Sequence, residues 1–255
     1  MFFHGLNMGI IFKQMLNLVC TVLTGRGTPE TWEETDSWLD TRIKLFQSYC
    51  LLSLSKQSDQ NFIHWICLRK RLNREIPHLG NSIFTFNGQP YWDDRVFNET
   101  LEERLKSTLK RLEKFAKKEK WISVTHLDSD DAFHKDVIKE IRKEVPGNRK
   151  ALIRQKGYVY DVKEQRLADW FCESPPFYTI IYPREVFFNP KKKLEYESFF
   201  KSHEDIIKVF NVKVMKERRY LVTIHSKNKS TIWNHPFKGK EYSEEESRKI
   251  LKGFI

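Results

Sequence analysis

Hydrophobic positions in the first 145 residues alternate between short unbroken runs and longer stretches with apolar side chains every three or four residues. The unbroken runs are 16–24 (LNLVCTVLT), 61–68 (NFIHWICL), 82–86 and 121–127 (WISVTHL). Such runs are typical of strands buried on both faces. The spaced stretches, residues 37–56 and 99–118, predict amphipathic helices. A shorter helix is expected over residues 133–143, so this part of the chain follows a β-α-β-α-β order.

The pattern changes after residue 148, where the expected elements become shorter and mixed. The expected strands are 150–155, 158–162, 166–171, 177–182, 213–216 and 220–225, and the expected helices are 196–210 and 243–251. We therefore predict an α/β fold: a Rossmann-like mixed sheet flanked by helices, followed by a C-terminal mixed α+β half. The predicted divisions are an N-terminal extension over 1–15 and two halves of one domain, 16–148 and 149–255.

An acidic cluster, Asp128-Ser129-Asp130-Asp131, directly follows the expected strand 121–127. In extended backbone, residues i and i+2 point the same way, so Asp128 and Asp130 are expected to face one cation. Mg²⁺ and Mn²⁺ prefer such oxygen ligands and often share them with substrate phosphates. Ligands of open α/β sheets bind beyond the carboxyl ends of the strands, which is where this cluster lies.

Three other interpretations compete for the same cluster. Ser129, Asp130 or Asp131 could cap the following helix, and capping is compatible with metal binding. A calcium loop of the EF-hand type is rejected, because it needs Gly and Glu where this chain has Phe133 and Lys139. A phosphotransferase also uses paired aspartates after a strand, although usually after the first strand.

The composition shows an excess of basic over acidic residues and four cysteines. The formal net charge of +11 suits anionic partners, either nucleic acid, anionic lipid or phosphorylated small molecules. We find no aromatic-basic pattern of the kind that single-strand binders use, so nucleic-acid binding without catalysis stays the alternative. The cysteines at 20, 50, 67 and 172 form no C-x-x-C pair, which favours reduced, buried thiols in a cytosolic protein.

The apolar N-terminus is interrupted by polar residues. Between residues 1 and 24 these are His4, Asn7, Lys13, Gln14 and Asn17. A membrane-spanning helix needs about 20 predominantly apolar residues, and a signal peptide needs a cleaner core. We therefore predict a cytoplasmic protein, with peripheral contact to the inner face of the membrane left open.

Several segments together resemble one family. Residues 38–57 (WLDTRIKLFQSYCLLSLSKQ), Asn61-Phe62, Trp65, residues 125–134 (THLDSDDAFH) and 174–179 (SPPFYT) are similar to segments of a bacterial rhamnosyltransferase family of the family 2-like, GT-A glycosyltransferase type. His225, Asn228, Ser230, Thr231 and Trp233 resemble its closing "H..N.ST.w" pattern. His126 stands where that family more often has Arg. The resemblance spans roughly residues 16–235.

This resemblance implies a GT-A fold with a nucleotide-sugar-binding half (16–148) and an acceptor-binding half (149–255). It implies a nucleotide-sugar donor and a divalent cation, Mn²⁺ or Mg²⁺, with Asp128 and Asp130 as metal ligands. Ser129 is a further candidate for donor contact. Arg26, Arg42 and Arg69 lie where the family's donor pocket forms, although Arg42 on its helix also fits a surface role.

The resemblance also suggests roles in the second half. Glu204 or Asp205 is the candidate base for the acceptor hydroxyl, the alternative being a solvated helix face. His225 is the candidate third metal ligand, and a structural histidine is the alternative. Asn228, Ser230 and Thr231 are expected to contact diphosphate or acceptor oxygens, or to form a turn.

The sequence therefore predicts a metal-dependent glycosyltransferase that moves a sugar from a nucleotide-diphosphate donor to a hydroxyl acceptor. From the family, the acceptor is expected to be a surface polysaccharide or a lipid-linked glycan.

Overall fold

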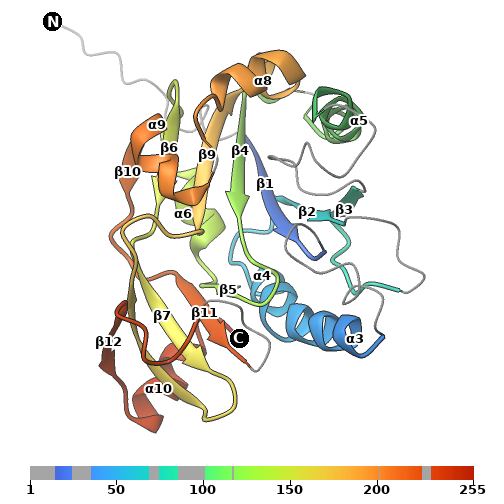
Figure 1. The fold of residues 1–255 in the computed structure, drawn as a ribbon. Helices are drawn as coiled ribbons and strands as arrows, with labels where there is room; N and C mark the ends of the chain where they lie inside the picture. The colour runs from blue at the N-terminus through green and yellow to red at the C-terminus, as the bar shows by residue number, and fades with distance from the viewer. Residues whose placement is uncertain are drawn as a thin grey trace, which may run out of the picture.

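The computed structural model describes residues 15–24, 36–68, 75–85, 101–116, 118–200, 202–225 and 231–255. Over these residues, the molecule contains two β-sheets, and helices cover both faces of the larger one (Figure 1). In this described part, no helix is both long enough and apolar enough to cross a membrane. All four cysteines are free and buried, as predicted.

The larger sheet has seven strands in the order β10-β6-β9-β4-β1-β2-β3. They are β1 (Met15–Val22), β2 (Ile63–Cys67), β3 (Ser82–Thr85), β4 (Trp121–His126), β6 (Lys150–Ile153), β9 (Tyr178–Pro183) and β10 (Asn211–Val214). Strands β3, β2, β1 and β4 are parallel, whereas β9 runs antiparallel to β4 and β6. The first half of the chain thus builds the parallel part, and β6, β9 and β10 extend the same sheet.

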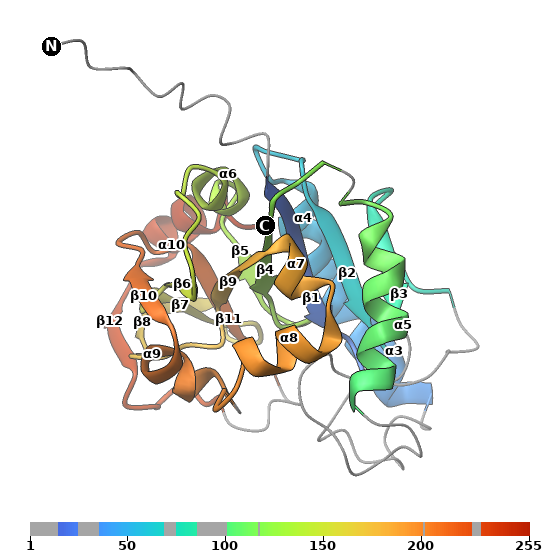
Figure 2. The ribbon, with the colours of Figure 1, turned by 90° about the horizontal axis from the view of Figure 1, so that it is seen from above.

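Successive side chains of the central strands pack alternately into two hydrophobic cores, one on each face of the sheet. Leu18 and Cys20 pack with α5 (Leu101–Glu113), α7 (Arg184–Phe187) and α8 (Pro190–Tyr196). Val19 packs on the other side, against the helical residues 46–54 that follow α3 (Asp36–Leu45), and against α6 (Val137–Arg142). Figure 2 shows these helices on opposite sides of the strands.

The helix predicted over 37–56 is continuous, but its middle part is π-helical instead of α-helical. It runs through α3, a π-helical segment at Phe46–Leu51, and α4 (Leu52–Ser55). Its buried side chains include Phe46, Cys50 and Leu54, which matches the predicted apolar face.

The smaller sheet has the order β12-β8-β7-β11-β5. Its strands are β5 (Ala132–Phe133), β7 (Lys156–Asp161), β8 (Arg166–Phe171), β11 (Tyr220–Ile224) and β12 (Lys238–Glu241). Helix α10 (Glu244–Leu251) covers it, and the side chain of Ser243 caps that helix by accepting from the Glu246 backbone N–H. Gly157 on β7 leaves room for the Tyr220 ring, because a Cβ there would approach that ring to 2.3 Å.

The predicted fold class is confirmed, and most strands lie where they were expected. Two helices were misplaced. The segment predicted as one helix over 196–210 is the end of α8, a break at Phe199, a 3-10 turn (His203–Asp205) and α9 (Ile206–Val209). The helix predicted from residue 133 begins at Val137, because residues 132–133 pair with β11 instead.

Candidate active site

The acidic cluster forms a turn between the two sheets. Strand β4 ends at His126, the Asp131 backbone N–H donates to the Asp128 carbonyl at 3.2 Å, and β5 begins at Ala132. We call residues 128–131 the acidic turn. The expectation of extended backbone here is wrong, because the chain must bend to pass from one sheet into the other. As a result the two carboxylates differ: the Asp128 side chain is 41% exposed and that of Asp130 only 14%.

Among the described residues, the Asp130 carboxylate has two side-chain partners, an arginine from α3 and a histidine that follows β11. Its Oδ2 accepts from Arg42 Nη1 of α3 at 2.9 Å and lies 3.0 Å from Nε2 of His225, which follows β11. Burial alone would raise the pKa of Asp130. The His225 hydrogen bond and the Arg42 charge outweigh burial, so the pKa of this carboxyl is lowered and it stays ionised.

Asp131 fastens the acidic turn to β11. Its Oδ1 accepts from the Thr223 backbone N–H at 2.8 Å, and Thr223 Oγ1 donates to the Asp130 carbonyl at 2.6 Å. Burial, together with the neighbouring charges of Asp130 and Asp128, raises the pKa of Asp131 well above its usual value. These two hydrogen bonds fix where Asp130 meets His225.

Asp128 lies at the open side of the turn, beside His126. His126 Nδ1 donates to the Pro176 carbonyl at 3.0 Å, and its ring stacks on Tyr178. The other ring nitrogen, Nε2, is 3.8 Å from Asp128 Oδ1. Burial raises the pKa of Asp128, and the negative charge of Asp130 raises it further. His126, Arg42 and His203 act in the opposite direction.

The charge of this site is unbalanced in the described part of the chain. Three carboxylates face one permanently charged partner, Arg42, because histidines carry charge only when protonated. No group of three or more His, Cys, Asp or Glu side chains in the described residues converges as a metal cage would require. The predicted set of Asp128, Asp130 and His225 does not form such a group: His225 is bonded to Asp130, while Asp128 lies beside His126.

A family model described as "Putative rhamnosyl transferase" matches residues 32–234, well over half of the chain. The chain belongs to this family. It is a glycosyltransferase, as its sequence predicted. The matched region includes Arg42, the acidic turn and His225, so the whole site lies inside the family's domain.

Solved structures give more distant likenesses. One is 4-diphosphocytidyl-2C-methyl-D-erythritol synthase from Anaerococcus prevotii, with a TM-score of 0.38, 13% identity, and coverage of 81% of this chain and 89% of that one. Another is a glycosyltransferase involved in glycosylation of the major capsid of PBCV-1, with a TM-score of 0.35, 8% identity, and coverage of 93% and 98%. No curated protein matches the chain.

The two candidate bases of this glycosyltransferase have different surroundings. Asp205 caps the 3-10 turn by accepting from the Ser202 backbone N–H at 3.2 Å, and it lies 3.9 Å from Lys208 Nζ. Glu204 is exposed. The residue before it, His203, donates from Nδ1 to the Ser174 carbonyl, and the nearby Pro176 carbonyl accepts from His126, which lies beside Asp128. The segment 203–205 is therefore connected to the acidic turn through residues 174–176 and His126.

The other predicted site residues are one buried serine, one half-buried threonine and four residues outside the described chain. Ser129 is buried, and its Oγ has no hydrogen-bond partner among the described residues. Arg26, Arg69, Asn228 and Ser230 lie outside the described residues, so their predicted donor contacts stay predictions. Thr231 is described and half-buried.

Sequence reasoning missed one residue that shapes the site and gave two others no role in it. Thr223 gave no local signal, because it acts through a partner distant in the chain. His203 stood beside the candidate bases, but its bond to the Ser174 carbonyl could not be read from the sequence. His126 was noted only as a departure from the family pattern, yet it faces Asp128. Arg42 was expected in the donor pocket or on the surface, and its pairing with Asp130, 88 residues away, could not be read from its helix.

Proposed function

We propose that this glycosyltransferase transfers a sugar from a nucleoside-diphosphate donor to a hydroxyl acceptor, using a divalent cation bound by Asp128 and Asp130. The observation that carries the proposal is the charge balance of the acidic turn. Within the described residues, three carboxylates and one arginine leave an excess of two negative charges when all three acids are ionised, which one Mg²⁺ or Mn²⁺ would neutralise.

The ligand set fits a cation that also binds substrate. Asp128 is the more exposed carboxylate, and within the described residues its one ion-pair contact is with the His126 ring at 3.8 Å, which carries charge only when protonated. Two carboxylates are too few for an all-protein cage, but they suit a cation that completes its coordination with phosphate oxygens and water. When bound, such a cation neutralises the charge that develops on the departing nucleoside diphosphate.

The remaining residues of the site have roles that follow from their contacts. Arg42 and His225 hold Asp130 ionised and aimed at the site. Asp131 and Thr223 keep the acidic turn in place. Of the two candidate bases, Glu204 is the better one, because the carboxylate of Asp205 already caps the turn and lies beside Lys208. A base must reach the acceptor proton within hydrogen-bond distance.

The family suggests the setting of the reaction. We propose a surface polysaccharide or a lipid-linked glycan as acceptor, on the cytoplasmic side of the membrane. The formal net charge of +11 supports peripheral contact with anionic lipid, since basic surfaces are attracted to such membranes.

A thermal-shift screen with UDP-, GDP-, dTDP- and CMP-sugars, each with and without Mn²⁺, tests this proposal. A ligand at a hundredfold excess over its Kd stabilises the folded state by about 2.7 kcal/mol. We expect one nucleotide class to raise the melting temperature by several degrees only when Mn²⁺ is present, and Asp130→Asn to lose that gain. An equal gain in Asp130→Asn, or no gain with any donor, would contradict the proposal.

A further inference from the structure

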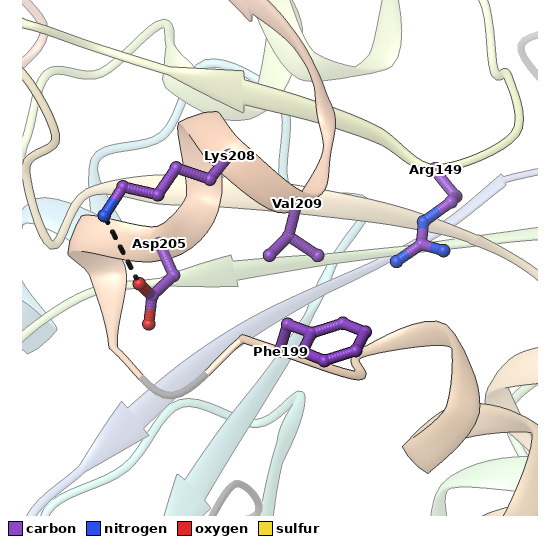
Figure 3. Close-up of a pocket in the computed structure, with 5 residues that line it drawn as sticks. All are labelled: Arg149, Phe199, Asp205, Lys208 and Val209. Atoms are coloured by element: carbon purple, nitrogen blue, oxygen red, sulfur yellow. Dashed lines mark ion pairs between the residues drawn. The ribbon is translucent and has the colours of Figure 1, made fainter.

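A concave site lies beside the 203–205 turn. It is a pocket of about 570 Å³ lined by Arg149, Phe199, Asp205, Lys208 and Val209. Figure 3 shows Arg149 at one end and the Asp205–Lys208 pair at the other, with Phe199 and Val209 between them. We call it the basic pocket, because its two cations outnumber its one carboxylate.

Backbone strain is concentrated around this pocket. In the described part of the chain, three non-glycine residues have positive φ, and two of them line the pocket: Arg149 at 48° and Phe199 at 72°. A bulky side chain in the left-handed region costs free energy and persists only where the surroundings enforce it. Such strain is typical of ligand sites, and here it places two unlike side chains at one cavity.

The Phe199 ring contributes little to the fold that holds it. Its side chain is 84% exposed, the largest exposure among the exposed large hydrophobic residues of the described chain. A strained backbone that presents an uncovered aromatic ring is hard to explain by stability. It is well explained if the ring stacks on a ligand that has a flat apolar face.

Arg149 is held in place by the end of α8 but keeps hydrogen-bonding capacity. Its Nη2 donates to the Tyr196 carbonyl at 3.1 Å, and its guanidinium lies over the Tyr196 ring. Its Nε is buried, so the capacity lies with Nη1, which makes no hydrogen bond within the described residues. An arginine fixed in this way is suited to bind a carboxylate or phosphate oxygen.

We propose that the basic pocket binds an anionic sugar residue of the acceptor glycan, one or more residues away from the hydroxyl that reacts. The apolar C–H face of the pyranose stacks on Phe199, and Arg149 pairs with the carboxylate or phosphate of that sugar. Lys208 adds positive potential at the other end. This inference rests on the proposed function, and it names the class of acceptor.

The position of the pocket supports an acceptor role. Asp205 lines it, while His203, two residues earlier, bonds to the Ser174 carbonyl. Pro176, two residues after Ser174, accepts from His126, which lies 3.8 Å from Asp128. A short series of hydrogen bonds therefore connects the turn that borders the basic pocket to the acidic turn.

The test measures binding of free saccharides by NMR titration, without donor, metal or turnover. The probes are trigalacturonate as a uronate, trehalose 6-phosphate as a sugar phosphate, and maltotriose as a neutral control. We expect one or both anionic probes to bind more tightly than maltotriose. Phe199→Ala and Arg149→Gln should each weaken that binding about five- to tenfold. Phe171→Ala, which removes a half-exposed phenylalanine on β8, is the matched control and should change nothing.

The results separate this inference from the proposed function. Failure of both anionic probes to bind, or equal binding by wild type and the two pocket variants, overturns the pocket but leaves the donor screen intact. Sedimentation with phosphatidylglycerol vesicles is the second measurement. If Phe199→Ala weakens vesicle binding while saccharide binding is unchanged, the surface contacts membrane and the acceptor assignment is wrong. Unchanged melting temperatures in the variants would confirm that folding is not the cause.

Discussion

Two groups of carboxylates in this protein differ in how their charge is balanced. Glu140 bonds to Arg154 at 3.0 Å and to Arg219 at 2.9 Å, and Glu144 bonds to Lys150 and Lys213. Although burial opposes it, these lysines lower the pKa of Glu144. We call Glu140 and Glu144 the paired glutamates. In the acidic turn, by contrast, burial and mutual repulsion raise the pKa of Asp128 and Asp131.

The difference distinguishes a structural role from a functional one. Each of the paired glutamates bonds to two basic side chains, so its negative charge is balanced within the fold without any ligand. The acidic turn has Arg42 alone as a permanent cation among its described contacts. Buried negative charge of this kind is costly unless a further cation compensates it. Substitutions in the two groups should therefore have opposite consequences.

The largest expected effect is on activity. Asp130→Asn should lower kcat/KM for sugar transfer at least about a hundredfold, because it removes a charge that the proposed cation requires. Its melting temperature should change by only a few degrees, since the lost Arg42 contact is offset by less repulsion from Asp128 and Asp131. Steady-state assays and thermal unfolding of the same preparation check this. Full activity in Asp130→Asn would remove the distinction between the two groups.

The matched substitution among the paired glutamates is Glu140→Gln. It leaves Arg154, whose side chain is 4% exposed, without its carboxylate. Breaking a buried pair in this way should destabilise the protein by about 3 kcal/mol. Transfer activity per folded molecule should stay near wild type. Denaturant unfolding measures the loss of stability, and an inactive but fully stable Glu140→Gln protein would reverse our assignment of roles.

A smaller effect should follow from releasing the acidic turn from β11. Thr223→Val removes the hydroxyl that donates to the Asp130 carbonyl, whereas Thr223→Ser keeps it. We expect the valine variant to raise the KM for the donor about fivefold, consistent with the loss of one hydrogen bond. The serine variant should stay within about twofold of wild type. If both variants behave alike, the hydroxyl does not position the turn.

The smallest effect concerns stability against pH in the presence of a chelator. The raised pKa of Asp128 means that its ionisation destabilises the fold as pH rises above the ordinary carboxyl value of about 4. Asp128→Asn should therefore raise the melting temperature at pH 7, by roughly 1–3 °C, because this partly exposed carboxyl is screened by solvent. The gain should vanish near pH 4.

Glu144→Gln is the control for that pH series. The lowered pKa of Glu144 gives stability that is complete above its ordinary value and is lost as pH falls through its folded value. This variant should therefore melt at a lower temperature than wild type at pH 7. A parallel decrease in Asp128→Asn at pH 7 would show that the acidic turn is as well balanced as the paired glutamates.

The sequence predicted the parallel strands well because they are buried on both faces. In β1 and β4 almost every side chain is buried, so the apolar runs were unbroken and easy to recognise. The prediction failed where apolar residues at helical spacing belong to several short elements and not to one helix. Tyr196, Phe200, Ile206 and Phe210 all pack into one core, but they come from α8, a loop, α9 and the residue after it.

Better signals for that segment were present in the sequence. Asn189 followed by Pro190 begins α8, where the Asn189 side chain accepts from the Lys192 N–H. Ser202 and Asp205 form the capping box of the next turn. Strand β12, with the polar sequence KGKE, gave no apolar pattern because it lies at the edge of its sheet.

The candidate site was predictable only in part, for a physical reason. Asp128 and Asp130 are visible in sequence because they are two residues apart and follow a strand. Their surroundings depend on contacts over 88 to 95 residues, from Arg42 and His225, which only the tertiary fold creates. The family resemblance supplied His225, and the structure supplied its actual bond to Asp130.

The central claim is that the acidic turn holds a divalent cation, and Mn²⁺ binding measured by electron paramagnetic resonance tests it most directly. The experiment titrates Mn²⁺ into wild type, Asp130→Asn and Glu140→Gln, each with the nucleoside diphosphate of the donor identified in the thermal-shift screen. We predict one bound Mn²⁺ in wild type and Glu140→Gln, and at least about a tenfold weaker affinity in Asp130→Asn. Equal binding by all three proteins would contradict the account.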